Sequence, residues 1–582
     1  MKLPLLQIKD LSIDFVTNSV SVSAVQNISF DVNKGEMVAV VGESGSGKTV
    51  TSLSILQLLP SPPAMYKSGK ILFSEDGINE RNLVGLQEKD LRKIRGNKIS
   101  MIFQEPMTSL NPVQTCGVQV MEALMLHKKI SGKIARQKTT ELFSQVKLPD
   151  AAAMVNRYPH QISGGQKQRV MIAMAMSCEP ALLIADEPTT ALDVTVQKTI
   201  LQLIKELQQQ KGMGVIYITH DLALVAEIAD KVVVMYKGKV VETGSAKDIF
   251  LKPVHPYTKA LLSCRPSASN KGKRLPVITD FMDDGIYKNH ENHLPISLAE
   301  EGSKIINGRK KQPDFTKPPT PLLKVENLKV YFPVKKSFTG KILKEAKAVD
   351  DVSFSIDEGE TVGLVGESGC GKTTLGRALI RLIEPSGGKI FFNGKNIAHI
   401  PGEQMRKMRK EIQIIFQDPY GSLNPRITIG QAINEPMKIH QIAPTEKQRK
   451  EKIMQLLQKV DLKPEHFNRY PHEFSGGQRQ RICIARALSL NPDFIICDES
   501  VSALDVSVQA QVLNLLNELK EEFGFTCIFI SHDLAVVHYI SNRILVMNKG
   551  KIEESGTADD IFFHPKSLYT QHLIDSIPKV DF

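Results

Sequence analysis

One glycine-rich motif occurs twice in this sequence. Residues 42–49 read Gly-Glu-Ser-Gly-Ser-Gly-Lys-Thr, and residues 366–373 read Gly-Glu-Ser-Gly-Cys-Gly-Lys-Thr. Both fit G-x-x-x-x-G-K-[ST], in which glycines let backbone N–H groups curl around phosphate oxygens and the next helix directs its positive end at them. A short apolar run precedes each motif and helical apolar spacing follows it. A coincidental turn could explain one motif, but two in matched contexts predict two nucleotide sites.

Further motifs recur in the same order, so the second half of the chain repeats the first. Gln417 lies 313 residues after Gln104 (417 − 104) and Ser475 lies 312 residues after Ser163 (475 − 163), so the register holds over more than 100 residues. The recurring motifs are Phe-Gln-Glu/Asp-Pro (103–106, 416–419), Ser-Gly-Gly-Gln (163–166, 475–478), Asp-Glu (186–187, 498–499), Ala-Leu-Asp (191–193, 503–505) and Thr/Ser-His-Asp (219–221, 531–533). A chain of 582 residues is too long for one ordinary core. A duplicated domain is therefore predicted.

Each half has the pattern of an α/β domain. Continuous apolar runs of strand length end at the acidic pairs and before the histidines, with helical patterns between them, which favours a sheet covered on both faces. Between the halves periodicity fades, and Pro, Gly, Lys and Asn accumulate, as in a linker that could hold a small ordered element. We predict a first domain at 1–263, a linker at 264–320 and a second domain at 321–582.

The loops hold the residue types that a magnesium nucleotide needs. The lysine can bind the β- and γ-phosphates as a point charge, and the next threonine can offer its hydroxyl to Mg²⁺. An aspartate at the end of a later apolar strand can orient Mg²⁺, and the glutamine can contact the ion or its water. The predicted metal ligands are Thr49, Gln104, Asp186, Thr373, Gln417 and Asp498. The predicted loop contacts to nucleotide are Gly42, Glu43, Ser44, Gly45, Ser46, Gly47, Lys48, Thr49, Gly366, Glu367, Ser368, Gly369, Cys370, Gly371, Lys372 and Thr373.

Two residues in each half are candidates for catalysis. Glu187 and Glu499 follow the strand-end aspartates and can polarise an attacking water. His220 and His532 follow the next strand and can hold the attacking geometry at a γ-phosphate. Taken alone, either residue type is more often part of a solvated loop or a packed core. Their recurrence in one register favours a catalytic function.

The Ser-Gly-Gly-Gln turns open a second helix in each half. Such a helix start is another anion-binding site, although a simple helix-capping turn is the alternative. A domain with one phosphate loop does not obviously need another such site, so we predict composite sites in which the loop of one half faces this turn of the other half. The predicted contacts are Ser163, Gly164, Gly165, Gln166, Ser475, Gly476, Gly477 and Gln478.

Composition limits the remaining choices. The net charge of +11 fits a generally basic surface, an anionic membrane face or nucleic acid, and does not choose between them. No apolar stretch approaches the ~18 residues that span a bilayer, and the start of the sequence lacks the apolar run of a signal peptide. The seven scattered cysteines form no C-x-x-C pair, so neither a zinc site nor a disulfide framework is expected.

This order of motifs resembles the ABC transporter ATPases. The resemblance covers most of the chain and implies two tandem P-loop domains, each with a RecA-like α/β core, a helical subdomain and an antiparallel β subdomain. It implies ATP and Mg²⁺ as cofactors, two competent sites closed head-to-tail, two transmembrane permease subunits and a solute-binding protein as partners, and a peripheral location on the cytoplasmic face of the plasma membrane. An aromatic residue upstream of each loop stacks on adenine in this family. Phe15 and Phe332 hold the matching places, with core packing as the alternative.

A narrower resemblance points to the dipeptide/oligopeptide importers, in the fused double-domain form known from glutathione and microcin importers. It rests on Phe-Gln-Glu-Pro-Met-Thr-Ser-Leu-Asn-Pro (103–112), Arg-Tyr-Pro-His (157–160, 469–472) and His-Pro-Tyr-Thr-Lys-Ala-Leu-Leu (255–262). The alternative is a soluble twin ATPase acting on ribosomes or nucleic acid, which usually has a long charged helical linker. Residues 264–320 are broken by prolines, so we predict the importer subunit and no nucleic-acid partner. The transported solute is not encoded in these motifs.

Overall fold

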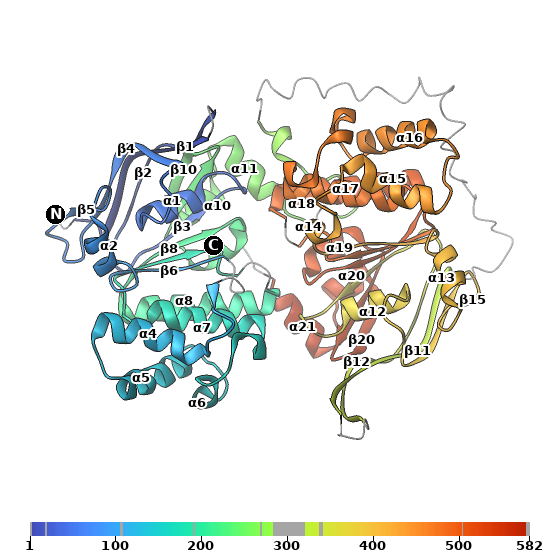
Figure 1. Ribbon diagram of the computed structural model, residues 1–582, viewed down its shortest axis with the longest axis horizontal. Helices are drawn as coiled ribbons and strands as arrows, with labels where there is room; N and C mark the ends of the chain where they lie inside the picture. Colours follow the sequence, from blue (N-terminus) through green and yellow to red (C-terminus); the bar gives the residue numbers. More distant parts are fainter. Residues whose placement is uncertain are drawn as a thin grey trace. The chain divides into compact units, whose positions relative to one another are not determined.

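The computed structural model describes residues 3–17, 20–104, 109–189, 192–267, 270–282, 321–336, 342–502 and 504–577 (Figure 1). The chain divides into two compact units. The first is built chiefly from Met1–Ser263, and the second chiefly from residues after 320 together with Cys264–Thr279. The Ala-Leu-Asp motifs lie partly outside the described residues, because 191 and 503 do.

A mostly parallel sheet forms the centre of the first unit. Among the described residues its strand order is β10-β9-β3-β8-β7-β6, and only β10 runs antiparallel to its neighbour. The strands are β3 (Met37–Val41), β6 (Ile99–Ile102), β7 (Leu182–Asp186), β8 (Gly214–Thr219), β9 (Lys231–Tyr236) and β10 (Lys239–Ser245). Because β3, β7 and β8 are buried along their whole length, they read as unbroken apolar runs in the sequence.

Alternate residues of these strands enter two different hydrophobic clusters. In β7, Leu183 and Ala185 pack toward the helices, whereas Leu182 and Ile184 pack toward a second sheet. This alternation follows from the two-residue period of a strand. The second sheet is antiparallel, has the order β2-β1-β4-β5 and consists of β1 (Leu6–Thr17), β2 (Val20–Val32), β4 (Ala64–Phe73) and β5 (Arg81–Asn82).

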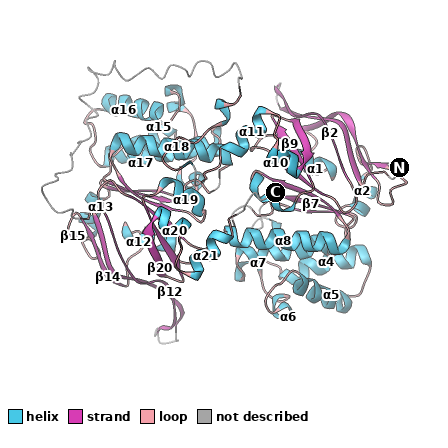
Figure 2. Cartoon of the chain, turned by 180° about the vertical axis from the view of Figure 1, so that it is seen from behind, coloured by secondary structure: helices cyan, strands magenta, loops and turns pink. Residues whose placement is uncertain are grey.

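The helices of the first unit cover the central sheet and form a separate helical part. Figure 2 shows α4, α5, α6 and α7 gathered at one end of the unit. Their bounds are α4 (Cys116–Lys128), α5 (Gly132–Gln145), α6 (Ala151–Met154) and α7 (Gly164–Met176). The others are α1 (Lys48–Ile55), α2 (Glu88–Ile94), α8 (Val194–Lys211), α9 (Leu222–Ile228), α10 (Ala246–Leu251) and α11 (Pro256–Ser263), with 3₁₀ turns at Pro159–Gln161 and Ile278–Asp280. The helical spacing after the first loop corresponds to α1, which ends at Ile55 just before Gln57 takes a left-handed φ of 49°.

The second unit repeats this architecture. Its central sheet has the order β16-β17-β18-β13-β19-β20, and its antiparallel sheet the order β12-β11-β14-β15. The strands are β11 (Leu323–Lys336), β12 (Ile342–Ile356), β13 (Thr361–Val365), β14 (Gly387–Phe392), β15 (Lys395–Asn396), β16 (Ile412–Ile415), β17 (Phe494–Asp498), β18 (Thr526–Ile530), β19 (Arg543–Asn548) and β20 (Lys551–Thr557). The predicted α/β fold with helical and antiparallel parts in each half is confirmed.

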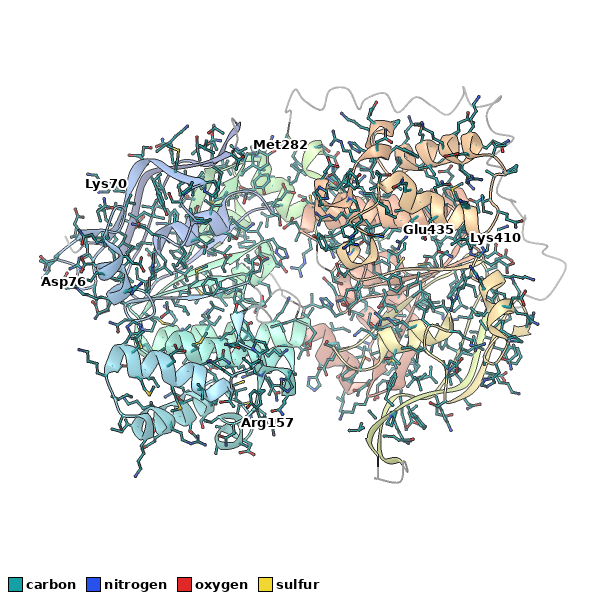
Figure 3. All side chains as sticks on the ribbon, in the orientation of Figure 1. Lys70, Asp76, Arg157, Met282, Lys410 and Glu435 are labelled. Carbon is teal, nitrogen blue, oxygen red and sulfur yellow. The ribbon has the colours of Figure 1, made fainter. Side chains whose placement is uncertain are left out.

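The helices of the second unit follow the same order. They are α12 (Lys372–Leu379), α13 (Gly402–Met408), α14 (Pro419–Ser422), α15 (Ile429–Ile439), α16 (Glu446–Lys459), α17 (Gly476–Leu488), α18 (Val506–Phe523), α19 (Leu534–Ile540), α20 (Ala558–Phe563) and α21 (Leu568–Asp575), with 3₁₀ turns at Pro464–Asn468 and Pro471–Glu473. Within the described ranges, every helix is too short or too polar to cross a bilayer. Side chains such as Lys70 and Asp76, labelled in Figure 3, lie on the outer surface of the first unit.

Part of the predicted linker packs onto the second unit. Asn514 of α18 accepts the N–H of Leu275 at 2.9 Å and donates to the carbonyl of the same residue at 2.9 Å. The hydroxyl of Tyr539 in α19 donates to the carbonyl of Lys273 at 2.8 Å. The segment around Leu275 is therefore anchored by its backbone, while 268, 269 and 283–320 lie outside the described residues.

Candidate nucleotide sites

The carboxyl ends of three neighbouring strands bring the predicted residues of each unit together. In the first unit β8 lies between β3 and β7, with Val41 paired to Thr219 and Asp186 paired to Ile218. The phosphate loop after β3, the Asp-Glu pair at the end of β7 and the histidine after β8 therefore meet at one edge of the sheet. The second unit has the same order with β13, β17 and β18.

Each phosphate loop turns directly into a helix through a glycine. Gly47 is the N-cap of α1 with φ 97°, and Gly371 is the N-cap of α12 with φ 112°, a region that other residues rarely adopt. A Cβ atom on Gly47 would also lie 2.7 Å from the carbonyl oxygen of Ala24. The positive φ angle and the lack of room for a Cβ atom thus both require glycine at the last glycine position of the motif.

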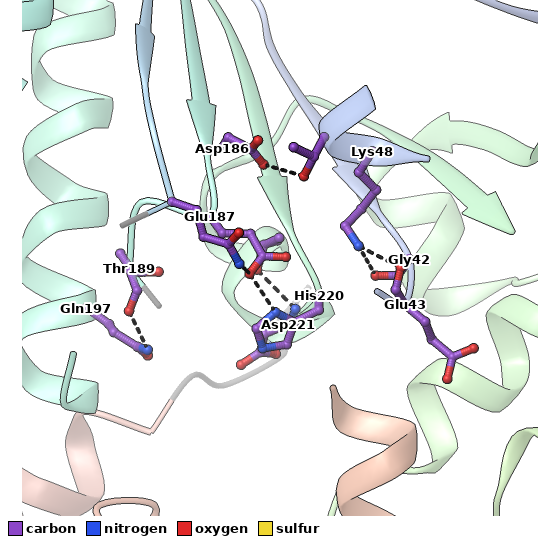
Figure 4. A network of polar contacts seen from close by, with 12 residues as sticks. Gly42, Glu43, Lys48, Asp186, Glu187, Thr189, Gln197, His220 and Asp221 are labelled. Atoms are coloured by element: carbon purple, nitrogen blue, oxygen red, sulfur yellow. Dashed lines mark hydrogen bonds and ion pairs between the residues drawn. The ribbon is translucent and has the colours of Figure 1, made fainter. Parts of the chain in front are cut away.

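The loop lysines lie inside their loops. The Nζ of Lys48 donates to the carbonyls of Gly42 at 2.7 Å and Glu43 at 2.8 Å (Figure 4). The Nζ of Lys372 makes the equivalent contacts with Gly366 at 2.7 Å and Glu367 at 2.9 Å. Both lysines are 4% exposed. A buried ammonium and the positive helix start of α1 or α12 give each loop the electrostatics of an anion site.

Two of the three predicted magnesium ligands, the threonine and the aspartate, lie in contact within each unit. The hydroxyl of Thr49 donates to Asp186 at 3.3 Å, and the hydroxyl of Thr373 donates to Asp498 at 3.0 Å. Both aspartates are buried, and Oδ2 of Asp498 has no hydrogen-bond partner among the described residues. A hydroxyl beside a buried carboxylate is a donor set that Mg²⁺ accepts when nucleotide phosphates complete its shell.

Two neighbours of these aspartates were not predicted from the sequence. The hydroxyl of Ser52 donates to Asp186 at 3.3 Å, whereas the second unit has Gly376 one turn along the helix and instead brings Arg377 within 4.0 Å of Asp498. Both residues lie one helical turn after the loop. The helical spacing after each loop could have suggested a contact from the next turn of the helix, but it does not single out Ser52 or Arg377.

Burial raises the pKa of Asp186 to about 6, and the charge of Glu187 adds to this effect. Burial also raises the pKa of Asp498, against the hydrogen bond from Thr373 and the charge of Arg377. Burial acts on Glu499 in the same direction, but hydrogen bonding and charge from His532 and the charge of Lys372 hold its pKa below the usual value. Each unit thus keeps a costly buried carboxylate at the position predicted to bind a cation.

We expect Asp186→Asn to stabilise the first unit in the absence of nucleotide and divalent cations. The folded pKa of Asp186, about 6, lies above its ordinary value of 3.8. The cost of the buried charge is therefore fully present above pH 6 and is relieved as the pH falls toward 3.8. At pH 8 the variant should gain about 3 kcal/mol of unfolding free energy, since the two pKa values differ by about 2.2 (6 − 3.8) and a difference of one corresponds to ~1.4 kcal/mol.

Differential scanning calorimetry between pH 4.5 and 8.5 checks this expectation. The gain in melting temperature should shrink steadily below pH 6. Asp76→Asn is the control, because backbone N–H groups of Asn79 and Ile78 hold the pKa of Asp76 far below its usual range, so this substitution should destabilise at pH 8. A lower melting temperature for Asp186→Asn at pH 8 would contradict the expectation.

The predicted catalytic glutamate and histidine lie close together in each unit, and the glutamate accepts a hydrogen bond from the predicted metal-binding glutamine. Oε2 of Glu187 accepts from Nε2 of Gln104 at 3.0 Å and lies 3.4 Å from Nδ1 of His220 (Figure 4). In the second unit Gln417 donates to Glu499 at 2.6 Å, and Nδ1 of His532 lies 3.8 Å from the same carboxylate.

Both glutamates also adopt an unusual backbone conformation. The φ angle is 46° at Glu187 and 48° at Glu499. Non-glycine residues rarely take such values, which tend to be retained where function requires them. The two units share this conformation at matching positions, and no sequence pattern predicted it.

The Ser-Gly-Gly-Gln turns lie elsewhere in the units, at the starts of α7 and α17. Ser163 and Gln166 cap α7 reciprocally, with the N–H of Gln166 donating to the Ser163 hydroxyl at 3.3 Å and the N–H of Ser163 donating to Oε1 of Gln166 at 3.0 Å. Ser475 and Gln478 cap α17 in the same way at 3.4 and 3.1 Å. The turns are therefore capping boxes, and their nucleotide contacts stay a prediction.

The two predicted adenine-stacking residues differ in their surroundings. Phe15 of β1 packs against the core of the antiparallel sheet. Phe332 of β11 is 41% exposed. Core packing therefore applies to Phe15, which is partly buried. Adenine stacking stays a prediction for both phenylalanines.

Fold and loops together define a nucleotide-binding protein with two P-loop domains. The ABC transporter family matches residues 25–190 and 349–502, and the oligopeptide/dipeptide transporter C-terminal region matches 241–282 and 554–582. The chain belongs to the ABC transporter ATPases of the oligopeptide/dipeptide importer family and carries two ABC domains. It is the ATP-binding subunit of an importer, and the alternative of a twin ATPase acting on nucleic acid finds no support.

Curated relatives extend over almost the whole chain. A glutathione import ATP-binding protein, GsiA, from Pectobacterium atrosepticum is 46% identical over 99% of this chain and 90% of its own length. The GsiA protein of Escherichia coli K12 is 47% identical over 98% of this chain and 89% of its own length. A solved ATP-binding cassette, MJ0796 bound to ADP and Pi, is 28% identical over 40% of this chain and 98% of its own, with a TM-score of 0.37.

Proposed function

We propose that this protein drives the uptake of a peptide-class solute by hydrolysing ATP at two sites, one built on each phosphate loop. The observation that supports both sites is the meeting of the loop, the Asp-Glu pair and the histidine at one sheet edge in each unit. Neither unit has lost its lysine, glutamate or histidine. Two competent sites follow from this symmetry.

In this proposal the lysines, glutamates, histidines and glutamines have different roles. Lys48 and Lys372 bind the terminal phosphates, which requires their ammonium groups to leave the loop carbonyls. Glu187 and Glu499 polarise the attacking water, and His220 and His532 hold that geometry through their contacts with the glutamates. Gln104 and Gln417 orient the same carboxylates from the start of the helical part.

Mg²⁺ is the proposed metal cofactor. Thr49 and Asp186 would hold it in the first unit, and Thr373 and Asp498 in the second, with Gln104 and Gln417 within reach of the ion or its water. When bound, Mg²⁺ neutralises phosphate charge. The raised pKa of Asp186 supports this assignment, because a divalent cation would offset the cost of the buried carboxylate.

We propose composite sites in which the loop of one domain and the Ser-Gly-Gly-Gln turn of the other share a nucleotide. The support is that each unit by itself offers two glycine-rich helix starts, at α1 and α7 or at α12 and α17. The domains in this proposal are 1–263 and 321–582, joined by 264–320. Their partners are two transmembrane permeases and a solute-binding protein, and the protein acts peripherally on the cytoplasmic face of the plasma membrane.

The proposed solute is a short peptide, with glutathione as the first to test because relatives are named for glutathione import. Cells lacking this gene should take up radiolabelled glutathione or a dipeptide more slowly than the parent strain. The wild-type gene should restore uptake, whereas the Glu187→Gln/Glu499→Gln gene should not. Restoration by that variant, or normal uptake of every peptide tested in the deletion strain, would refute the proposal.

A further inference from the structure

A tyrosine contacts the second residue of each phosphate loop. The backbone N–H of Glu43 donates to the hydroxyl of Tyr257 in α11 at 3.0 Å, and the N–H of Glu367 donates to the hydroxyl of Tyr569 in α21 at 3.0 Å. Both tyrosines lie in the segments that match the transporter C-terminal region. The contact therefore joins this region to the nucleotide loop within each unit.

The same peptide group is held at both of its polar ends. The N–H of Glu43 belongs to the peptide whose carbonyl is that of Gly42, and this carbonyl accepts from Nζ of Lys48 at 2.7 Å. Tyr257 thus fixes one end of the peptide plane, and Lys48 fixes the other. The second unit repeats this with Tyr569 and Lys372. With both ends held, the peptide resists the flip that would turn the Gly42 carbonyl toward an anion.

The position of each tyrosine is itself fixed by a carboxylate from the central sheet. Glu242 of β10 accepts the N–H groups of Val254 at 2.8 Å and His255 at 3.1 Å, just before α11. Glu554 of β20 accepts those of Lys566 at 2.8 Å and Ser567 at 3.1 Å, just before α21. A charged acceptor that caps the start of a helix is among the stronger local contacts.

The two copies keep this chain of contacts although their sequences have diverged. His255 and Pro256 of the first copy correspond to Ser567 and Leu568 of the second. The ring of Tyr257 is fully buried and packs against Tyr236 with centroids 4.3 Å apart, whereas Asn548 stands at the matching place in the second unit. The glutamate, the tyrosine and the 3.0 Å contact persist through these changes.

We propose that Tyr257 and Tyr569 are positioning residues that hold the phosphate loops in their nucleotide-binding shape, so that the C-terminal region of each domain sets its ATP affinity. This rests on the proposed role of the loops. When the lysine ammonium leaves the carbonyl of Gly42 or Gly366 for a phosphate, the tyrosine keeps the peptide plane in place. The tyrosine acts through the loop backbone and does not touch the nucleotide in this scheme.

The test is Tyr257→Phe/Tyr569→Phe in the full-length protein, which removes two hydroxyls and keeps both rings. The dissociation constant and KM for MgATP should each rise about three- to tenfold, the usual effect of one lost hydrogen bond, while kcat changes by less than about twofold. Hydrogen exchange at the loop amides of residues 42–47 and 366–371 should become faster. Tyr539→Phe is the matched control, because its hydroxyl contacts Lys273 and not a loop.

The outcomes separate this proposal from the assignment of the loops. Unchanged MgATP affinity in the double variant, with or without faster exchange, would overturn the proposed role of the tyrosines. If Lys48→Ala/Lys372→Ala bound MgATP as tightly as the wild-type protein, the loop assignment would be refuted instead. Hydrogen exchange in the tyrosine double variant would still report the contact between tyrosine and loop. If the double variant fails to fold, each single variant is measured with the other loop as an internal reference for exchange.

Discussion

ATP turnover by the purified full-length protein should fall by about 10²- to 10⁴-fold when Glu187 and Glu499 are both replaced by glutamine, the range expected for loss of a general base. Glutamine keeps the shape of the side chain but loses the negative charge that polarises water. Each glutamate accepts a hydrogen bond from a glutamine amide and lies near a histidine ring. A neutral amide in its place has only one acceptor oxygen for these two neighbours. Phosphate release measures the effect.

Binding of ATP should survive this substitution, because no predicted phosphate contact is removed. The double variant should retain labelled ATP through gel filtration, while the wild-type protein should release ADP. Glu435→Gln is the control, since this exposed glutamate lies on α15 and is not one of the residues of the catalytic group. Turnover within about twofold of wild type in the double variant would remove the assigned catalytic role.

The second large effect is expected for the loop lysines. In Lys48→Ala/Lys372→Ala the dissociation constant for MgATP should rise by about 30- to 1000-fold, because losing one partner of a buried charge pair costs about 2–4 kcal/mol. The substitution also leaves the carbonyls of Gly42 and Gly366 without their ammonium donor. Isothermal titration with MgATP gives the constant directly.

A matched lysine distinguishes loop chemistry from a change of overall charge. Lys70→Ala removes the same charge from an exposed position on β4 (Figure 3) and should leave the dissociation constant within about twofold of wild type. Lys48→Arg should not restore binding, because a guanidinium fork replaces a point charge inside a closely fitted loop. Tight MgATP binding by the double alanine variant would show that the glycine loops are not the phosphate sites.

Residue types at fixed spacing explain why so much of each site could be predicted. A loop of glycines followed by lysine and threonine has few other uses. Its recurrence ahead of Asp186/Asp498 and His220/His532, which share one register, indicated paired sites. The alternation of apolar strands and helices predicted the α/β fold for the same reason. The capping box of Ser163 and Gln166 is also visible in the sequence, since Ser-x-x-Gln before a helix is its signature.

Contacts between residues far apart in the chain could not be predicted in this way. Tyr257 lies 214 positions from Glu43, and Leu275 lies 239 positions from Asn514. Such pairs depend on which helix packs beside which strand, and no local spacing encodes them. The left-handed φ of Glu187 and Glu499 was equally hidden, because glutamate has no intrinsic preference for that region.

By itself the sequence determined the duplication, the two phosphate loops, the strand-end acids and histidines and hence the family, because each depends on residue type at short, regular spacing. Only the tertiary structure decided which hydroxyl or guanidinium lies beside each buried aspartate. It also decided that Gln104 and His220 both contact Glu187, and that a tyrosine of the C-terminal region contacts each loop. The physical reason is that hydrogen bonds and buried charges act over about 3–4 Å in space. Sheet order and helix packing, not separation along the chain, bring those atoms together.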